Sequence, residues 1–221
     1  MAYKLVIFDL DGTLADTFPW FLGVLNGVAD RYRFRRIEKH EVERLRGFSA
    51  RQMVKHLGVP AWKLPLIARH MRSLSARDID DLQLFDGIDT MLRSLSKAGL
   101  VLAVVSSNSE ENVRRLLGPE LAELIGHYAC GASLFGKAAK LRKVLKLSRV
   151  SPAEVICIGD EIRDYEAARR VGLAFGAVAW GFTSPEAFQA LRPEAMFLGP
   201  RRIVEVLAPA TNRTECSPRA V

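Results

Sequence analysis

Short hydrophobic runs recur along the chain, and each ends at polar residues or at glycine. They are rich in Val, Ile and Phe and lie at Leu5–Phe8, Leu100–Val105, Val155–Ile158, Ala174–Ala179 and Ala195–Leu198. Such runs, separated by segments of helical length, are typical of strands that are buried on both faces. The pattern therefore predicts a parallel sheet covered by helices on both sides, and the run at His127–Cys130 is a further candidate strand.

The segments between these runs have the spacing of amphipathic helices. In one of them Ile88, Met91, Leu92 and Leu95 fall on one helical face, and Gly99 follows as a helix-ending residue. Strands that alternate with such helices favour a doubly wound, Rossmann-like α/β fold. In that fold the ligand crevice lies at the carboxyl ends of the strands.

A long stretch between the first strand and the run at Leu100 has only helical patterns, and it is too long for one crossover helix. We therefore expect a core domain of residues 1–15 and 84–207, with residues 16–83 inserted as a helical cap. Residues 208–221 are rich in Pro, Thr, Ser, Asn and Arg, which predicts a disordered tail. The candidate cap helices are Thr17–Arg31, Glu41–Arg46, Ala50–Leu57 and Trp62–Ser73.

The composition fits a protein that folds in aqueous solution. Of the 221 residues 49% are hydrophobic, and no run approaches the roughly 20 apolar residues that a membrane-spanning helix requires. The first residues also lack a secretory pattern, so we expect a soluble, cytoplasmic protein with no membrane partner. The three cysteines, Cys130, Cys157 and Cys216, form neither a disulfide framework nor a zinc motif.

The net charge of +7 comes from dispersed arginine pairs and not from one basic block. Dispersed pairs are typical of solvated helix faces, so no nucleic-acid partner is expected. A mild attraction for anionic substrates is consistent with this charge. The pairs are Arg35-Arg36, Arg114-Arg115, Arg169-Arg170 and Arg201-Arg202.

The first predicted strand ends in the sequence Asp-Leu-Asp-Gly-Thr. It places Asp9 and Asp11 at the edge of the sheet where a ligand would bind. Gly12 permits a tight turn there, and Thr13 follows it. Taken alone, this sequence is also typical of an acidic turn that only ends a strand.

Polar residues also follow the strand at Leu100–Val105. Ser106, Ser107 and Asn108 stand directly before a predicted helix. Their hydroxyl and backbone N–H groups suit a phosphate, because helix N-termini favour anions, although serine and asparagine are also ordinary helix caps. Further along, Lys137 begins another helical segment and is a candidate cation for the same site.

A second acidic cluster follows the strand at Val155–Ile158. Asp160 comes directly after Gly159, and Asp164 lies four residues further on. A solvated acidic helix start would look similar. The order of the whole set argues for a site, because an acidic pair, hydroxyl groups, a lysine and a second acidic cluster all fall at strand ends or helix starts.

This set of motifs resembles the four signature motifs of the haloacid dehalogenase superfamily, over the sheet domain from residue 1 to about 207. The insert at 16–83 is similar to that family's first type of cap. Within the superfamily the chain is most similar to phosphoglycolate phosphatases and β-phosphoglucomutases. The resemblance implies a Mg²⁺-dependent phosphatase that forms an aspartyl-phosphate intermediate.

The resemblance also implies a role for each motif. Asp9 is expected to be the nucleophile and Asp11 the general acid and base. Mg²⁺ and Lys137 are expected to offset the repulsion between this nucleophile and a phosphate dianion. The expected phosphate-binding residues are Gly12, Thr13, Ser106, Ser107, Asn108 and Lys137, and the expected Mg²⁺ ligands are Asp9, Asp11, Asp160 and Asp164.

Two lysines compete for the third motif. Family members often have a Lys-Pro-x-Pro pattern, whereas this chain has Lys137-Ala138-Ala139-Lys140. Residues three apart lie on neighbouring positions of a helix, so periodicity does not separate them. Lys137 has the better position, at the presumed helix start, and Lys140 is expected to be solvated.

The predicted cap contains a segment, residues 46–51, that resembles the substrate-specificity loop of capped relatives. Arg46 and Arg51 are therefore candidates for binding a second anionic group of the substrate. The expected partner is a small phosphorylated metabolite, and the protein is expected to be a monomer or a homodimer. A phosphomutase and a non-catalytic binding protein are the alternatives, whereas Asp11 disfavours a dehalogenase.

Two other groups of residues are expected to have structural roles. Trp180, Gly181 and Phe182 follow a predicted strand, so they are candidates for the edge of the site, but core packing is the role we expect for them. The histidines have no ligand spacing and are expected to be surface or packing residues. They are His40, His56, His70 and His127.

Overall fold

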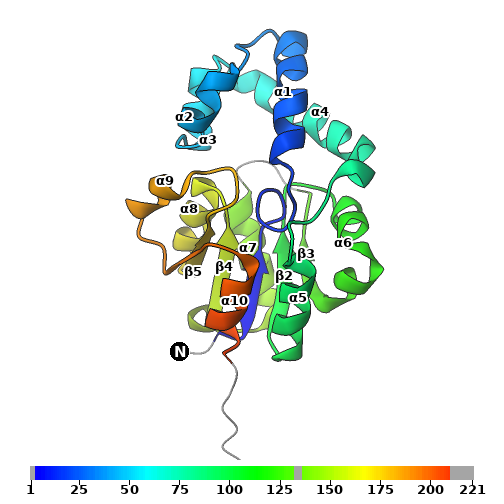
Figure 1. Ribbon diagram of the computed structural model, residues 1–221, viewed down its shortest axis with the longest axis vertical. Coiled ribbons are helices and arrows are strands. Elements are labelled where there is room, and N and C mark those ends of the chain that lie inside the picture. The colour runs from blue at the N-terminus through cyan, green and yellow to red at the C-terminus, as the bar shows by residue number, and fades with distance from the viewer. Residues whose placement is uncertain (1–2, 132–135, 210–221) are drawn as a thin grey trace, which may run out of the picture.

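One parallel sheet forms the centre of the molecule. Within residues 3–131 and 136–209, which this computed structural model describes, it contains six strands in the order β3-β2-β1-β4-β5-β6 (Figure 1). In register, Leu5 of β1 pairs with Val101 of β2 on one side and with Val155 of β4 on the other. The predicted parallel sheet is confirmed. Its strands are β1 (Leu5–Phe8), β2 (Val101–Val105), β3 (Ile125–Ala129), β4 (Val155–Gly159), β5 (Ala174–Val178) and β6 (Ala195–Phe197).

Helices cover both faces of this sheet, because successive strand residues point to opposite sides. Val6 and Phe8 pack into one hydrophobic cluster with α5, α6 and α10, and Leu5 and Ile7 pack into a second with α7, α8 and α9. In Figure 1, α5 and α10 stand in front of the sheet and α7 and α8 lie behind it, as a doubly wound fold requires. These helices are α5 (Ile88–Lys97), α6 (Glu110–Leu124), α7 (Lys137–Ser148), α8 (Ile162–Val171), α9 (Pro185–Gln189) and α10 (Pro200–Leu207).

The helices between β1 and α5, at residues 18–81, lie beyond the carboxyl ends of the strands, and we call this segment the helical insert (Figure 1). It has a small core of its own, formed by Leu25, Ile37, Leu45 and Leu57. Its α-helices are α1 (Phe18–Tyr32), α2 (Val42–Leu45), α3 (Ala50–His56) and α4 (Leu64–Arg77). The 3-10 turns are η1 (Lys39–Glu41), η2 (Ala61–Lys63) and η3 (Ile79–Asp81), and η4 (Pro152–Glu154) precedes β4.

Two of these helices differ from the sequence prediction for local reasons. The helix expected at Glu41–Arg46 is shortened to Val42–Leu45, because Glu41 ends the 3-10 turn η1, which a capping box of Glu38 and Glu41 starts. The helix expected at Trp62–Ser73 starts two residues later, with Pro65 in its first turn, and runs on to Arg77.

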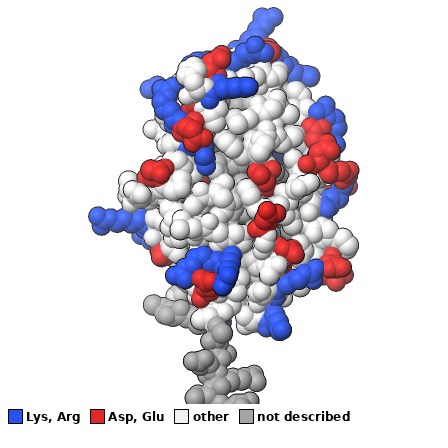
Figure 2. All heavy atoms as spheres, viewed as in Figure 1, with Lys and Arg blue, Asp and Glu red and all other residues white. Residues whose placement is uncertain are grey.

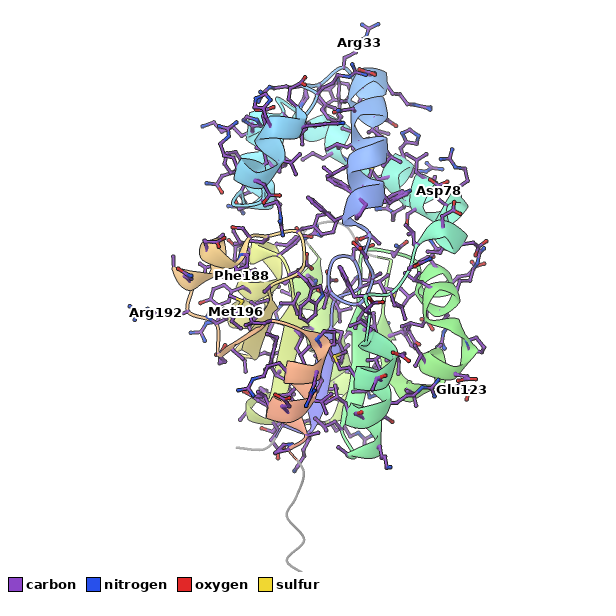
Figure 3. The ribbon with its side chains drawn as sticks, in the orientation of Figure 1. Arg33, Asp78, Glu123, Phe188, Arg192 and Met196 are labelled. Carbon is purple, nitrogen blue, oxygen red and sulfur yellow. The ribbon has the colours of Figure 1, made fainter. Side chains whose placement is uncertain are left out.

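The first and last helices of the insert are joined where they approach the sheet. The Trp20 indole of α1 donates to the Asp78 carboxylate at 2.9 Å, and Asp78 follows the last residue of α4. Figure 3 labels Asp78 at this end of the insert and Arg33, which ends α1 in the left-handed conformation, at the opposite end.

Charged side chains are spread over the surface. On the face shown in Figure 2, Lys and Arg side chains lie at scattered positions with Asp and Glu among them. Within the described ranges, no helix is long and apolar enough to span a membrane. The tail predicted to be disordered lies outside the described residues from position 210 onward.

Candidate active site

Asp9 stands at the carboxyl end of β1 and meets two other predicted site residues there. Its backbone N–H donates to the Ile158 carbonyl at 2.9 Å, which continues the strand pairing with β4. The Lys137 ammonium, at the first residue of α7, lies 2.8 Å from Asp9 Oδ1 and 2.5 Å from Asp164 Oδ1. Three motifs that are far apart in sequence therefore meet, and Lys137 is the lysine that contacts the Asp9 carboxylate.

Asp160 is fully buried at the end of β4 and is held by three donors. The Thr13 hydroxyl donates to its Oδ1 at 2.8 Å, and the Phe182 N–H donates to its Oδ2 at 2.8 Å. The Thr183 N–H donates to its backbone carbonyl at 3.3 Å. The Thr13 hydroxyl, expected to contact phosphate, is therefore directed to an aspartate.

Three carboxylates converge at this edge of the sheet. One oxygen from each of Asp9, Asp160 and Asp164 lies within 4.8 Å of the other two, and all three residues are buried. Desolvation by burial raises the pKa of Asp9, although Lys137 opposes this, and burial with neighbouring carboxylates raises the pKa of Asp160 well above its ordinary value. A buried cluster of like charges is costly unless a cation joins it.

The donor set of this cluster fits Mg²⁺, which prefers oxygen ligands with carboxylates among them. Gly12 leaves the space that the cluster needs, because a Cβ at this position would lie 2.3 Å from Asp160 Oδ2. The Asp11 carboxylate lies outside the group of three. Desolvation and the neighbouring Asp9 raise the pKa of Asp11 to about 6.

A small pocket opens beside Asp9. Ser106, Ser107, Lys137, Lys140 and Arg163 also line it. Ser106 is 1% exposed, and its Oγ accepts a hydrogen bond from the Asn108 N–H at 3.0 Å, which fixes the turn after β2. The pocket thus places hydroxyl groups and three cations next to a carboxylate, a combination suited to a phosphate.

Lys140 is buried, so the expectation that it is solvated is wrong. Its side chain is 9% exposed, and its ammonium donates to the Ser106 carbonyl. Desolvation by burial lowers the pKa of Lys140 to about 8. The reason is tertiary: α7 packs against β2 and β3, and the face of α7 that carries Lys140 is turned toward the end of β2.

Five predicted phosphate- or substrate-binding residues are not among those that line this pocket: Gly12, Thr13, Arg46, Arg51 and Asn108. Arg46, directly after α2, donates from Nε to the Phe182 carbonyl at 3.2 Å and from Nη2 to the Gly181 carbonyl at 2.8 Å. Asn108 is buried, and its amide donates to the Ser75 hydroxyl of α4 at 3.2 Å. These two residues therefore join the helical insert to the sheet domain, and Arg51 is exposed at the start of α3.

Two charged residues beside the site were not among the predicted ones. Arg163 lines the pocket and pairs with Glu161, which precedes α8. Burial raises the pKa of Glu161 to about 7, although Arg163 opposes this. The sequence does contain a signal, since Arg163 lies three residues after Asp160 in the first turn of a helix that starts at the ligand edge of the sheet.

Fold and site together define an α/β enzyme whose acidic residues meet a lysine at the carboxyl edge of a parallel sheet. Residues 6–178 match the haloacid dehalogenase-like hydrolase family, and the chain belongs to that family. The phosphoglycolate phosphatase of Synechococcus elongatus is 30% identical over 203 residues, which cover 91% of this chain and 96% of that one. The N-acetylmuramic acid 6-phosphate phosphatase of Pseudomonas aeruginosa is 28% identical over 94% of this chain and 96% of its own.

A solved structure shows the same fold. A haloacid dehalogenase-like hydrolase of Streptococcus pneumoniae superimposes with a TM-score of 0.76 at 20% identity, over 92% of this chain and 98% of that one. The predicted superfamily, its phosphoglycolate phosphatase-like branch and the predicted enzyme class, a phosphatase, are confirmed by these relatives together.

Proposed function

We propose that the protein hydrolyses small phosphate monoesters with Mg²⁺, through an aspartyl-phosphate intermediate formed on Asp9. The observation that supports this most is the contact of Asp9 with Lys137 in a pocket that Ser106 and Arg163 also line. A carboxylate that attacks a phosphate dianion needs nearby cations, because the two groups repel each other. This pocket provides them beside the carboxylate.

The proposed reaction has two steps. In the first, a carboxylate oxygen of Asp9 attacks phosphorus, the bond from phosphorus to the ester oxygen breaks, and Asp11 donates a proton to the leaving alkoxide. In the second, Asp11 takes a proton from a water molecule that attacks the phosphorus of the aspartyl-phosphate. Inorganic phosphate leaves, and the Asp9 carboxylate is regenerated.

The remaining residues hold the reacting groups. Asp9, Asp160 and Asp164 would bind Mg²⁺, with the Asp11 backbone carbonyl as a further ligand. When bound, Mg²⁺ would neutralise charge that develops on the phosphoryl oxygens. Lys137 bridges two of these carboxylates and so orients the nucleophile.

Arg163 extends the phosphate-binding set of this proposal. It lines the same pocket as Asp9 and is held by Glu161, whose carboxylate restricts the guanidinium. A planar guanidinium can bind two phosphoryl oxygens at once. Arg163 and the Ser106 and Ser107 hydroxyls would therefore surround the phosphoryl group from the side of α8 and β2.

We further propose that residues 16–83 act as a cap over a core of residues 1–15 and 84–207. The helical insert lies across the carboxyl end of the sheet, where it would exclude water and contact the rest of the substrate. A small phosphorylated metabolite, a cytoplasmic location and a monomeric or homodimeric state are predictions within this proposal. Phosphoglycolate and sugar phosphates are the substrate classes to test first, because the two relatives named above act on such esters.

The test is phosphate release from a panel of phosphometabolites with Mg²⁺, comparing the native chain with Asp9→Asn. We expect the native chain to hydrolyse at least one small monoester and Asp9→Asn to be inactive, since an amide is a poor nucleophile. Lys143→Ala, at an exposed position of α7, is the matched control and should retain native activity.

Three outcomes would contradict the proposal. Substantial turnover by a folded Asp9→Asn variant would remove Asp9 from its role. Isomerisation of a sugar phosphate, followed by phosphorus NMR, in place of phosphate release would indicate a phosphomutase. Binding of a phosphometabolite without any turnover of the panel would favour a binding protein on this fold.

A further inference from the structure

We propose that Phe182 is a positioning residue for Asp160, and that Arg46 of the helical insert holds it in place through one shared peptide group. Docking of the insert and alignment of Asp160 would then be a single event. The inference rests on the proposed function, because it takes Asp160 as a Mg²⁺ ligand. The segment concerned is the loop at 179–184, between β5 and α9. For Trp180, Gly181 and Phe182 in this loop, core packing was the expected role and a place at the edge of the site the alternative.

The shared group is the peptide bond between Gly181 and Phe182. Its N–H donates to Asp160 Oδ2 at 2.8 Å, and its carbonyl accepts a hydrogen bond from Arg46 Nη2 at 2.8 Å. A peptide group is planar, so the direction of its carbonyl fixes the direction of its N–H. A hydrogen bond at one end also polarises the group and strengthens the bond at the other end.

Further contacts hold the insert on this loop. Arg46 Nε donates to the Phe182 carbonyl at 3.2 Å, and the Arg46 carbonyl accepts from the Ser184 N–H at 3.1 Å. The Phe182 ring packs edge to face against Phe18 and Phe21 of α1, with centroid distances of 4.9 and 5.5 Å. The Arg46 guanidinium lies 5.5 Å from the centroid of Phe18. Arg46 therefore contacts both sides of the junction.

The loop has little room to shift on its other side. A Cβ at Gly181 would lie 2.1 Å from the Cβ of Asp160 and 2.6 Å from the Gly12 carbonyl. A Cβ at Gly12 would lie 2.4 Å from Cδ2 of the Phe182 ring. Such close packing transmits a displacement of the loop to Asp160, because no free space absorbs it.

If the insert moved away from the sheet, this loop would lose both guanidinium hydrogen bonds and two aromatic neighbours. The N–H that holds Asp160 Oδ2 would then be less well oriented. Loss of an outer partner of a metal ligand commonly lowers metal affinity about tenfold or more. The geometry therefore links closure of the insert to Mg²⁺ affinity, although Arg46 touches neither Asp160 nor the phosphate pocket.

The test measures Mg²⁺ affinity directly, by calorimetry on the full chain without substrate, for Arg46→Ala and Arg46→Lys. We expect Arg46→Ala to raise the dissociation constant for Mg²⁺ about fivefold to tenfold, at the lower end of such effects. Arg46→Lys keeps one donor group, so its dissociation constant for Mg²⁺ should lie between those of the native chain and Arg46→Ala. Arg44→Ala is the matched control, because this exposed arginine two residues away pairs with Glu41 inside the insert, and it should stay within about twofold.

Turnover supplies the second readout. If Arg46 acts through Asp160, kcat of Arg46→Ala should be restored by raising the Mg²⁺ concentration, whereas a general folding defect would not respond. Phe182→Leu keeps the peptide group but loses the ring contacts, and should weaken Mg²⁺ binding less than Arg46→Ala. Circular dichroism confirms the fold of each variant, and if Arg46→Ala does not fold, Arg46→Lys and Phe182→Leu decide.

The inference is overturned if a folded Arg46→Ala binds Mg²⁺ within twofold of the native chain. A changed ranking of substrates at unchanged Mg²⁺ affinity would also overturn it, because Arg46 would then contact substrate. These results leave the proposed function intact as long as the native chain hydrolyses its substrate with Mg²⁺. A native chain that turns over without binding Mg²⁺ would overturn the metal assignment and this inference with it.

Discussion

Replacing Lys140 by methionine should make the protein more stable at pH 7 and less active. The side chain is 9% exposed, and its ammonium donates to the Ser106 carbonyl beside the pocket. Methionine is similar in length and flexible enough to fill the same space without a charge. The substitution therefore separates the cost of burying a charge from its use in the site.

The expected gain in stability follows from two opposing effects. Desolvation by burial lowers the pKa of Lys140 from 10.5 to about 8. Because a tenfold change in proton affinity is worth about 1.4 kcal/mol, this fall corresponds to at most about 3 kcal/mol lost by keeping the ammonium charged, and solvent at the pocket screens part of that loss. The hydrogen bond to Ser106 offsets about 1 to 2 kcal/mol more, close to the value of a bond to a charged donor. We therefore expect the free energy of unfolding to rise by about 1 kcal/mol in Lys140→Met at pH 7.

The pH dependence of this difference is the sharper test. The unfolded chain keeps the Lys140 proton up to about pH 10.5, whereas the folded protein releases it above about pH 8. In that window the unfolded native chain binds more protons, so its contribution from Lys140 makes stability rise with pH. Urea denaturation at several pH values should show that the stability difference between Lys140→Met and the native chain shrinks as the pH rises from about 8 to about 10.5. A variant that is less stable at pH 7, or a difference that does not change with pH, would refute the reasoning.

Activity should move in the opposite direction to stability. Lys140→Met removes a cation from the pocket and the donor that holds the turn at Ser106, so kcat/KM should fall about tenfold. Lys143→Met, at an exposed position of the same helix, is the matched control for both measurements and should leave both unchanged. A variant with native kcat/KM would restrict Lys140 to a structural role.

The geometry of the site makes three other changes informative. Gly12→Ala should lower kcat about tenfold or more, because the φ of 78° strains alanine and its Cβ would approach Asp160 Oδ2. Initial rates on the folded variant test this. Native turnover would contradict the close packing. Arg163→Gln should raise the inhibition constant of inorganic phosphate about tenfold by losing a charged donor, and an unchanged constant would remove Arg163 from the phosphate pocket. Chelation of Mg²⁺ should stop phosphate release, and Ca²⁺ should not restore it, because the coordination shell of Ca²⁺ is larger and more flexible. Full turnover in metal-free buffer would refute the metal assignment.

Much of the fold could be predicted because its signals are local. Continuous hydrophobic runs such as Val155–Ile158 mark strands buried on both faces, and amphipathic spacing marks the helices between them. The convergence of Asp9 and Asp160 also follows from sequence, since residues after parallel strands meet at one edge of the sheet. What the pattern cannot give is the direction in which each side chain points once the helices pack.

Lys140 and Arg46 show this limit from two sides. Residues three apart on a helix lie on adjacent faces, so only the packing of α7 decides that Lys137 reaches Asp9 while Lys140 is buried beside Ser106. Arg46 pairs with Glu43 one turn earlier, but its contacts with the sheet domain are with the backbone carbonyls of Gly181 and Phe182, and a backbone group has no sequence signature. An arginine in a predicted cap loop therefore suggested a substrate contact, although its guanidinium is directed to the core.

The charges of the three-carboxylate cluster explain why a divalent cation suits it. Asp9, Asp160 and Asp164 carry three negative charges when ionised, and Lys137 balances one of them through its contacts with two of the carboxylates. Among the described residues, the donors to the Asp160 carboxylate are the Thr13 hydroxyl and the Phe182 N–H, which are neutral and orient it without compensating its charge. Two negative charges remain, equal and opposite to those of Mg²⁺, and burial makes their neutralisation favourable. Lys140 and Arg163 line the same pocket and would add positive charge next to a phosphate dianion, beside Lys137 and the metal.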